Sequence, residues 1–358
     1  MKVRGLTVLI LAAISAPVSA WTVDASGGDC GYLGGFWDAV TESCAVQRIS
    51  ATSLDNRVEG GATLIVEQSL DIAANATLKI DGGRLIVAEG AQLDNDGRLT
   101  LLPADFSAVL DIAGTMENRG DVTSFGGVSI GGTATNALNA TWIGQGITEI
   151  TAPGFLINFG TIRQSGFLFI DGALSNIGDP DIFAARIENL SGVIEVRPSG
   201  RLENVLTAEI ENVDGKIYIE GRWLNTLEAR VANGPTGFTS IVEIREGGNL
   251  DVLLASVFDT DRSTLQTALG STISVAERGV MRALGPSVTV LRGTSVIGPG
   301  GRFEQDSDAQ LLQFCQGVFD ATAGTVVNDG RMATLGGAFL GRPYRGSGRA
   351  VALPLCID

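Results

Sequence analysis

The sequence repeats one short phrase, apolar-x-Asn-x-Gly-x-apolar, along much of its length. The phrase is centred on Asn95, Asn118 and Asn176, and a shortened form lies at 157–160. Neighbouring asparagines of this kind are 18 to 23 residues apart, for example Asn95 and Asn118, or Asn118 and Asn136. Self-similarity at such a period is the mark of a repeat architecture, so each repeat should form one structural unit stacked on the next.

Within each phrase the apolar residues alternate with polar ones, as at Leu99 and Leu101 or at Ile217 and Ile219. A period of two predicts β-strands of about four to six residues. The strands are separated by Asn and Gly, which tolerate the left-handed backbone that tight turns need. Helical spacing is nearly absent; the one helix candidate is 261–269.

We therefore expect an all-β fold, a right-handed parallel β-solenoid (β-helix) with capped ends. Residues 55–340 would form about fourteen rungs of about twenty residues and a rod about 65 Å long. Leu and Ile, such as Leu101 and Ile219, would fill the interior, and Asn side chains would form a hydrogen-bonded ladder at a turn. An antiparallel β-sandwich is the alternative, although it has no reason to reuse Asn-x-Gly once in each cycle.

The first twenty residues have the form of a signal peptide. Lys2 and Arg4 precede a short apolar run, and Val18-Ser19-Ala20 has the small-x-small form of a cleavage site. We expect residues 1–20 to be removed, so that the mature chain begins at Trp21; an uncleaved anchor is the alternative. The protein would then be secreted, extracellular or at the cell surface, with the periplasm as another destination, and would not insert into a membrane after cleavage.

The composition limits the partners. The formal net charge is −15, and loss of Lys2 and Arg4 would make it more negative. Such a charge disfavours nucleic acid and anionic membrane surfaces. Glycine accounts for 48 residues and aromatics for only 6%, which suits many turns and small aliphatic strands better than a conventional globular core.

Four cysteines allow three pairings. Export favours disulfides, and two cysteines lie near each end, so we favour Cys30–Cys44 and Cys315–Cys356. The predicted organisation is then an N-terminal cap at 21–54, a solenoid at 55–314, and terminal rungs with a C-terminal cap at 315–358.

The cap carries a recognisable pattern. Gly35-Phe36-Trp37-Asp38 is followed by Thr41 and Cys44, and runs of Leu-x-Asn-x-Gly-x-Leu coils come after it. In this the chain resembles secreted, adhesin-like β-solenoid proteins of Gram-negative bacteria. The resemblance implies surface attachment or adhesion and carries over no catalytic residue, because the shared motif is structural.

The chain has no histidine, which excludes Ser-His-Asp and Cys-His catalysis and histidine-containing zinc sites. Parallel β-helices also host polysaccharide lyases and hydrolases, which use carboxylates. Paired carboxylates occur at Asp94/Asp96 and Asp179/Asp181, and the pairs Asp259/Asp261 and Asp306/Asp308 are our candidates for calcium. The simpler interpretation is that these residues occupy exposed turns.

The one local basic cluster is 342–349, in which Arg342, Arg345 and Arg349 flank Tyr344. It could hold an acidic glycan or a carboxylate-bearing partner, or its arginines could pair with acidic residues of adjoining rungs. We expect a structural or adhesive surface protein that binds an extracellular glycan or protein, with no cofactor unless calcium binds. The alternatives are a polysaccharide lyase or hydrolase, with 226–240 and 342–349 as loops around a groove, or a component of a larger surface assembly.

Overall fold

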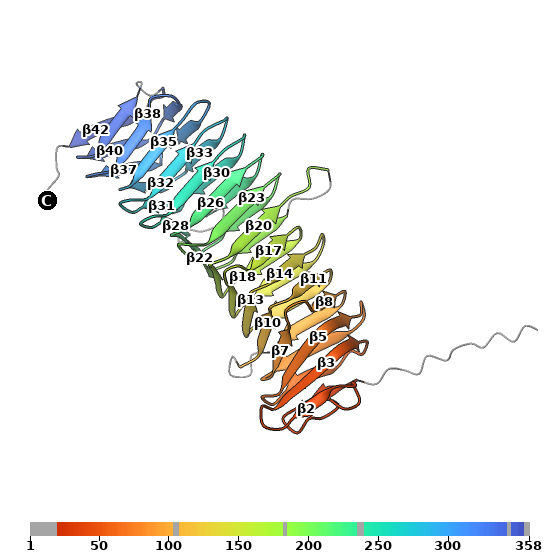
Figure 1. Cartoon of the computed structure of the whole chain (residues 1–358). Coiled ribbons are helices and arrows are strands. Elements are labelled where there is room, and N and C mark those ends of the chain that lie inside the picture. The colour runs from red at the N-terminus through yellow and green to blue at the C-terminus, as the bar shows by residue number, and fades with distance from the viewer. Residues whose placement is uncertain (1–19, 103–106, 182–184, 235–239, 342–344, 354–358) are drawn as a thin grey trace, which may run out of the picture.

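The chain forms a long, regular rod of stacked β-coils (Figure 1). The computed structural model describes residues 20–102, 107–181, 185–234, 240–341 and 345–353. In these ranges all regular structure is β-strand, and the fold is a parallel β-solenoid of about 13 turns. The predicted fold class is confirmed.

Each complete turn contributes three strands, so the rod has three faces. Face A is a continuous parallel sheet of 14 strands. Its members are β1 (Thr22–Val23), β4 (Asn56–Glu59), β6 (Thr77–Asp81), β9 (Arg98–Leu101), β12 (Asp121–Ser124), β15 (Thr141–Gly144), β18 (Thr161–Gln164), β21 (Arg186–Asn189), β24 (Glu209–Asn212), β27 (Arg230–Asn233), β30 (Val257–Asp261), β33 (Val280–Leu284), β36 (Arg302–Gln305) and β39 (Thr325–Asn328).

Face B is a second parallel ladder, which follows face A in each turn. It contains β7 (Arg84–Val87), β10 (Val109–Ile112), β13 (Gly127–Ile130), β16 (Ile147–Ile150), β19 (Phe167–Ile170), β22 (Val193–Val196), β25 (Lys216–Ile219), β28 (Ile241–Ile244), β31 (Thr264–Thr267), β34 (Val288–Leu291), β37 (Gln310–Phe314), β40 (Arg331–Leu335) and β42 (Arg349–Leu353).

Face C completes the turn. It contains β8 (Gln92–Asn95), β11 (Thr115–Asn118), β14 (Thr133–Asn136), β17 (Phe155–Asn158), β20 (Ala173–Ile177), β23 (Arg201–Val205), β26 (Arg222–Thr226), β29 (Asn249–Val252), β32 (Thr272–Val275), β35 (Thr294–Ile297), β38 (Val318–Ala321) and β41 (Ala338–Gly341). Near the N-terminus, the long strands β3 (Ser43–Ala51) and β5 (Thr63–Ile72) each run across faces B and C.

The core is the inside of the coil. Alternate residues of each strand point inward, and stacking in register places like residues above one another, as Leu99 lies between Leu78 and Val122. Leu101 and Ile219 are fully buried, as predicted. Burial of these aliphatic columns is the main stabilising term, because an isolated rung could not cover its own apolar side.

The predicted asparagine ladder is present and runs along the turn that follows face C. Each Asn Nδ2 donates to the Oδ1 of the next asparagine along the rod, at 2.7–2.9 Å. The ladder consists of Asn95, Asn118, Asn136, Asn158, Asn176, Asn204 and Asn225. A second, shorter ladder of Asn189, Asn212 and Asn233 follows face A.

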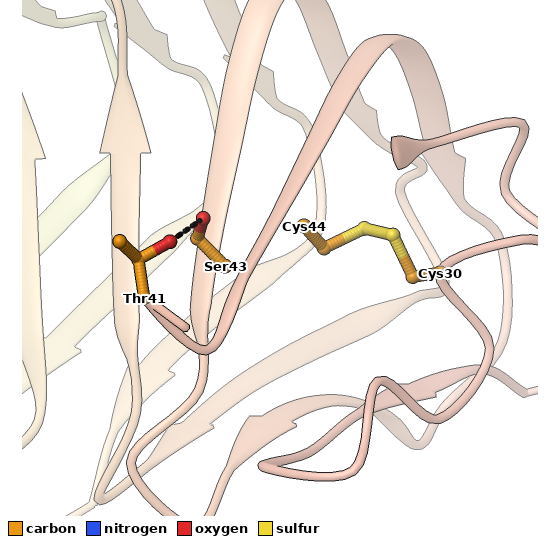
Figure 2. The surroundings of a disulfide bond; sticks show 4 residues. All are labelled: Cys30, Thr41, Ser43 and Cys44. Atoms are coloured by element: carbon orange, nitrogen blue, oxygen red, sulfur yellow. Dashed lines mark hydrogen bonds between the residues drawn. A yellow bond between two sulfur atoms is a disulfide. The ribbon is translucent and has the colours of Figure 1, made fainter. Parts of the chain in front are cut away.

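The N-terminal cap is stapled by the predicted disulfide between Cys30 and Cys44, whose Cα atoms are 5.7 Å apart (Figure 2). Strand β2 (Phe36–Asp38) pairs antiparallel with the start of β3, which covers part of the first edge of the solenoid. Gly35 is required here because a Cβ at this position would lie 2.8–2.9 Å from Val46 and from the Cys30 sulfur.

Two sequence-based predictions need comment. The helix expected at 261–269 is wrong, because Thr264–Thr267 is strand β31 and pairs with β28 and β34. Leu265 is buried in the core, in register with Val242 of the preceding rung. Strand pairing between rungs therefore outweighs the helical spacing of apolar residues in this segment. The second predicted disulfide stays a prediction, since Cys356 lies outside the described residues.

Candidate functional site

The predicted basic cluster lies partly outside the described residues, which exclude Arg342 and Tyr344. Arg345 forms an isolated parallel bridge with Val327, and its backbone exchanges hydrogen bonds with Val326 and Asn328. Arg349 begins β42, the last described strand of face B, and is exposed. Arg345 and Arg349 therefore lie at the C-terminal end of the rod, and the role of the cluster in glycan binding stays a prediction.

Asp259, a predicted calcium ligand, lies in an ion-pair network on the outer side of face A. Its side chain is only 4% exposed and accepts two hydrogen bonds from Arg282, at 2.6 and 2.7 Å. Arg230 approaches the same carboxylate at 3.5 Å. The hydrogen bonds that Arg282 donates to Asp259 raise the pKa of Arg282 above its usual value. Asp259 is thus compensated by two arginines from neighbouring rungs.

The other predicted calcium ligands lie at turns. Asp261 and Asp306 both lie beside Gly285. Asp306 accepts from the Gly285 N–H at 3.5 Å, and a Cβ at Gly285 would lie 2.9 Å from Asp261 Oδ1. Asp308 is exposed in the turn after β36. Within the described ranges no group of three acidic or cysteine side chains is arranged to hold a metal ion. Calcium binding at these carboxylates stays a prediction.

The outer side of face B carries a feature that the sequence-based reasoning missed. Over five consecutive strands, β16, β19, β22, β25 and β28, apolar, aromatic and charged side chains form three parallel rows. We call this surface the face B stripe; it consists of Ile147, Glu149, Phe167, Phe169, Asp171, Val193, Glu195, Arg197, Lys216, Tyr218, Glu220, Ile241, Glu243 and Arg245.

The stripe contains the same four-residue unit twice. In the first unit, Arg197 donates to Glu149 at 2.8 Å and to Asp171 at 2.7 Å, and its guanidinium carbon lies 4.3 Å from the Phe169 ring centre. In the second unit, Arg245 donates to Glu220 at 2.7 Å, lies 4.0 Å from Glu195, and stands 4.0 Å from the Tyr218 ring centre.

The second unit is displaced from the first by two rungs, because β19 is followed on face B by β22 and then β25. At the spacing of neighbouring strands this displacement is about 10 Å. The register of the solenoid thus produces a surface with a longer period of two rungs, in which each aromatic ring lies between two glutamates of neighbouring strands and contacts one arginine.

Charge compensation fixes the arginines of the stripe in place. Partial burial opposes the charged form of Arg197, but hydrogen bonds to Asp171 and Glu149 leave its pKa above the usual value. The same balance holds for Arg245, where Glu220 supplies the principal hydrogen bond. Both guanidinium groups therefore remain charged and held in one orientation. One nitrogen of each donates to the carboxylates, and the other N–H groups can donate to further acceptors.

The stripe also has an apolar row. Ile147 and Phe167 are about half exposed, and the Phe167 and Phe169 rings stack at 5.8 Å. The sequence contained a signal for this surface: in a chain poor in aromatics, 167–170 and 216–219 place aromatic rings at the outward positions of their alternation. Phe169 and Tyr218 are therefore only partly buried and contribute to the outer surface of face B rather than to the core.

Comparisons with known proteins add little to this picture. No protein-family model matches the chain, and no curated protein matches it in sequence. One solved structure, a crystal structure of a TibA fragment hyper-glycosylated in a reaction catalysed by TibC, aligns with 84% of this chain and 98% of its own. The identity is 14% and the TM-score 0.26, values too low to carry an argument about function.

A search for membrane-spanning helices gives no candidate in the part of the chain that the structure describes.

Proposed function

We propose that this protein is a secreted structural or adhesive surface protein that binds an extended, uncharged glycan along the face B stripe. The repetition of the Glu–aromatic–carboxylate–Arg unit at two-rung intervals is the observation that carries the proposal. A ligand recognised twice in the same way must itself repeat over about 10 Å, which is the scale of two sugar rings in an extended polysaccharide.

The chemistry of the stripe suits sugars. The aromatic and aliphatic rows can pack against the C–H faces of sugar rings, while carboxylates accept from hydroxyl groups and guanidinium groups donate to them. The stripe contains five carboxylates and only three basic side chains, so its net charge is negative and it would repel an acidic polysaccharide. An extended peptide is a poorer ligand, because peptides add to exposed sheet edges, whereas these strands are paired on both sides.

The disulfide between Cys30 and Cys44 supports the proposed secretion, since such bonds persist mainly in oxidising compartments. The signal peptide proposed for residues 1–20 would deliver the chain there. The alternative is an enzyme, but no arrangement of the described carboxylates favours it over a binding surface. We therefore expect the protein to release no cleavage products from the polysaccharides tested below.

Affinity electrophoresis tests the proposal with gels that contain hydroxyethylcellulose, galactomannan or polygalacturonate. We expect at least one neutral polymer to retard the protein and polygalacturonate to have no effect. The double variant Phe169→Ala/Tyr218→Ala should weaken binding at least tenfold, since each aromatic contact contributes about 0.5–1.5 kcal/mol beyond its buried area.

Phe314→Ala is the matched control. Phe314 also lies on face B beneath an arginine, Arg292, at 5.1 Å, but outside the stripe. Its loss should leave binding unchanged. Equal weakening by both variants, or no retardation in any neutral gel, would refute the stripe as a glycan site; release of reducing ends would instead support an enzyme.

A further inference from the structure

Two neighbouring columns of the face B stripe alternate in step with each other. Along the middle of the strands, glutamate and aromatic residues follow one another in the order Glu149, Phe169, Glu195, Tyr218 and Glu243. In the turn after each strand, carboxylates and arginines follow one another in the order Asp171, Arg197, Glu220 and Arg245. Over four consecutive rungs, a rung with an aromatic ring and a carboxylate therefore alternates with a rung that has a glutamate and an arginine.

The stripe is a regular strip that runs along the rod (Figure 1). From β16 to β28 the strands pair without a register shift. Beyond its two ends the outward side chains are small or uncharged: they are Gly127 and Ser129 of β13 on one side, and Thr264 and Gln266 of β31 on the other. The outward side chains of these two strands therefore do not close the strip, so a polymer can pass along it without presenting a chain end.

The linkage of a glycan decides whether it can follow such a strip. In a β-(1→4)-linked chain of glucose or mannose, both linkage bonds of each ring are equatorial, and the chain is a nearly straight ribbon. An α-(1→4) linkage includes an axial bond, and a β-(1→3) linkage joins its equatorial bonds at an angle, so both of these chains coil into helices. A helical chain leaves a straight surface after a few rings, whereas a ribbon stays in contact with every rung of the stripe.

The ribbon also has the period of the stripe. Each of its rings is flipped relative to the next, so hydroxymethyl groups point to alternate edges and the same orientation recurs at every second ring. With one ring on each rung, this period is two rungs, or about 10 Å. Rings of one orientation then meet Arg197 and Arg245, which donate hydrogen bonds, and rings of the other orientation meet Asp171 and Glu220, which accept them.

We propose that the face B stripe binds a β-(1→4)-linked glucan or mannan, which lies along the rod with one sugar ring on each rung. This inference rests on the proposed glycan binding and adds the linkage and the orientation of the ligand. The alternation of the two columns carries it, because a surface with the same residues on every rung would not distinguish one ring orientation from the other. The partly exposed Phe169 and Tyr218 then contact sugar rings that share one orientation.

Neutral polymers that differ in linkage test the inference in affinity gels. Hydroxyethylcellulose and galactomannan have β-(1→4)-linked backbones, whereas laminarin is β-(1→3)-linked and pullulan is α-linked. We expect the wild-type protein to bind hydroxyethylcellulose or galactomannan at least tenfold more tightly than laminarin or pullulan. Comparable or tighter binding of laminarin or pullulan would overturn the linkage while leaving the stripe as a glycan site. Absence of retardation by any of these polymers would refute glycan binding itself.

An exchange variant tests the period of the stripe. Glu195→Tyr/Tyr218→Glu keeps the composition and the net charge but moves the second aromatic ring to the rung next to Phe169. Both positions are only partly buried, so the melting temperature should change little. We expect at least tenfold weaker binding to the β-(1→4)-linked polymer. Unchanged binding by the folded variant would overturn the two-rung period, and the comparison of polymers with the wild-type protein decides the linkage even if the variant fails to fold.

Discussion

At the scale of single residues, the asparagines of the long ladder hold the turns between faces C and A. Asn136 accepts from Asn118, and its Nδ2 donates to Asn158 at 2.8 Å and to the backbone oxygen of Thr161 at 3.2 Å. Each side chain thus joins its neighbours along the rod and satisfies a backbone oxygen in the next turn of the coil. The side chains are fully buried, so a missing partner cannot be replaced by bulk water.

The ladder predicts different costs for the same substitution at its middle and at its end. Asn136→Ala should lower the free energy of unfolding by about 2–3 kcal/mol, because both its donor and its acceptor role are lost inside the rod. Asn95→Ala should cost less, about 1–2 kcal/mol, since Asn95 donates to Asn118 and Asp121 but its Oδ1 has no hydrogen-bond partner among the described residues. Urea unfolding of both variants measures the difference, and an equal or larger loss at Asn95 would contradict this account.

Asp55 predicts a residue-scale dependence on pH. Hydrogen bonds from Arg57 and Lys79 lower its pKa to about 2. A carboxyl group with a lowered pKa in the folded state stabilises the fold above its unfolded pKa of about 3.9, and this contribution is lost as pH falls towards 2. Asp55→Asn should therefore lower the melting temperature slightly at pH 5 and less at pH 2.5. A difference between variant and wild type that grows on acidification would show that the sign is wrong.

At the scale of strands, alternation decides which side chain faces the core. In β25, Ile217 and Ile219 are fully buried, whereas Lys216 is exposed and Tyr218 lies in the face B stripe. Alternation in the sequence predicted this inward set correctly, because the period of two is a property of the strand alone. It could not predict the stripe, since the contact of Arg197 with Phe169 depends on which rungs become neighbours, and that register is set by the lengths of turns far away in the sequence.

The same strand supplies a paired test. Ile219→Asp places a charge inside the coil, where no partner is available, and should lower the free energy of unfolding by several kcal/mol. Lys216→Asp changes charge at an exposed position of the same strand and should alter stability by less than about 0.5 kcal/mol. Thermal melts of both variants check the assignment of inward and outward positions, which would be wrong if the two losses were similar.

At the scale of the whole molecule, the rod is stabilised mainly by contacts between neighbouring rungs. The ladders pair each strand with the strand one turn before and one turn after it, as β22 pairs with β19 and β25. Stability in such a one-dimensional array is close to a sum of local terms, and its ends fray first. The sequence predicted both this architecture and the N-terminal staple, because repeats and cysteine positions are local signals. The exposed leucines in the turns after β23, β26 and β29, which are Leu206, Leu227 and Leu254, were not predicted, since leucines in a chain 44% hydrophobic resemble core residues until the turns are seen.

The N-terminal disulfide should therefore protect only its own end of the rod. Cys30–Cys44 closes a loop with a sequence separation of 14 residues, and its removal by Cys30→Ser/Cys44→Ser should cost about 3 kcal/mol through a less restricted unfolded chain. Because coupling passes from rung to rung, the loss should appear as faster amide hydrogen exchange in β1 to β5, with β25 and its neighbours unchanged in the same sample. The middle rungs are an internal control that needs no second variant. Faster exchange along the whole rod would mean that it unfolds as a single cooperative unit, and that the stability of this solenoid is global rather than local.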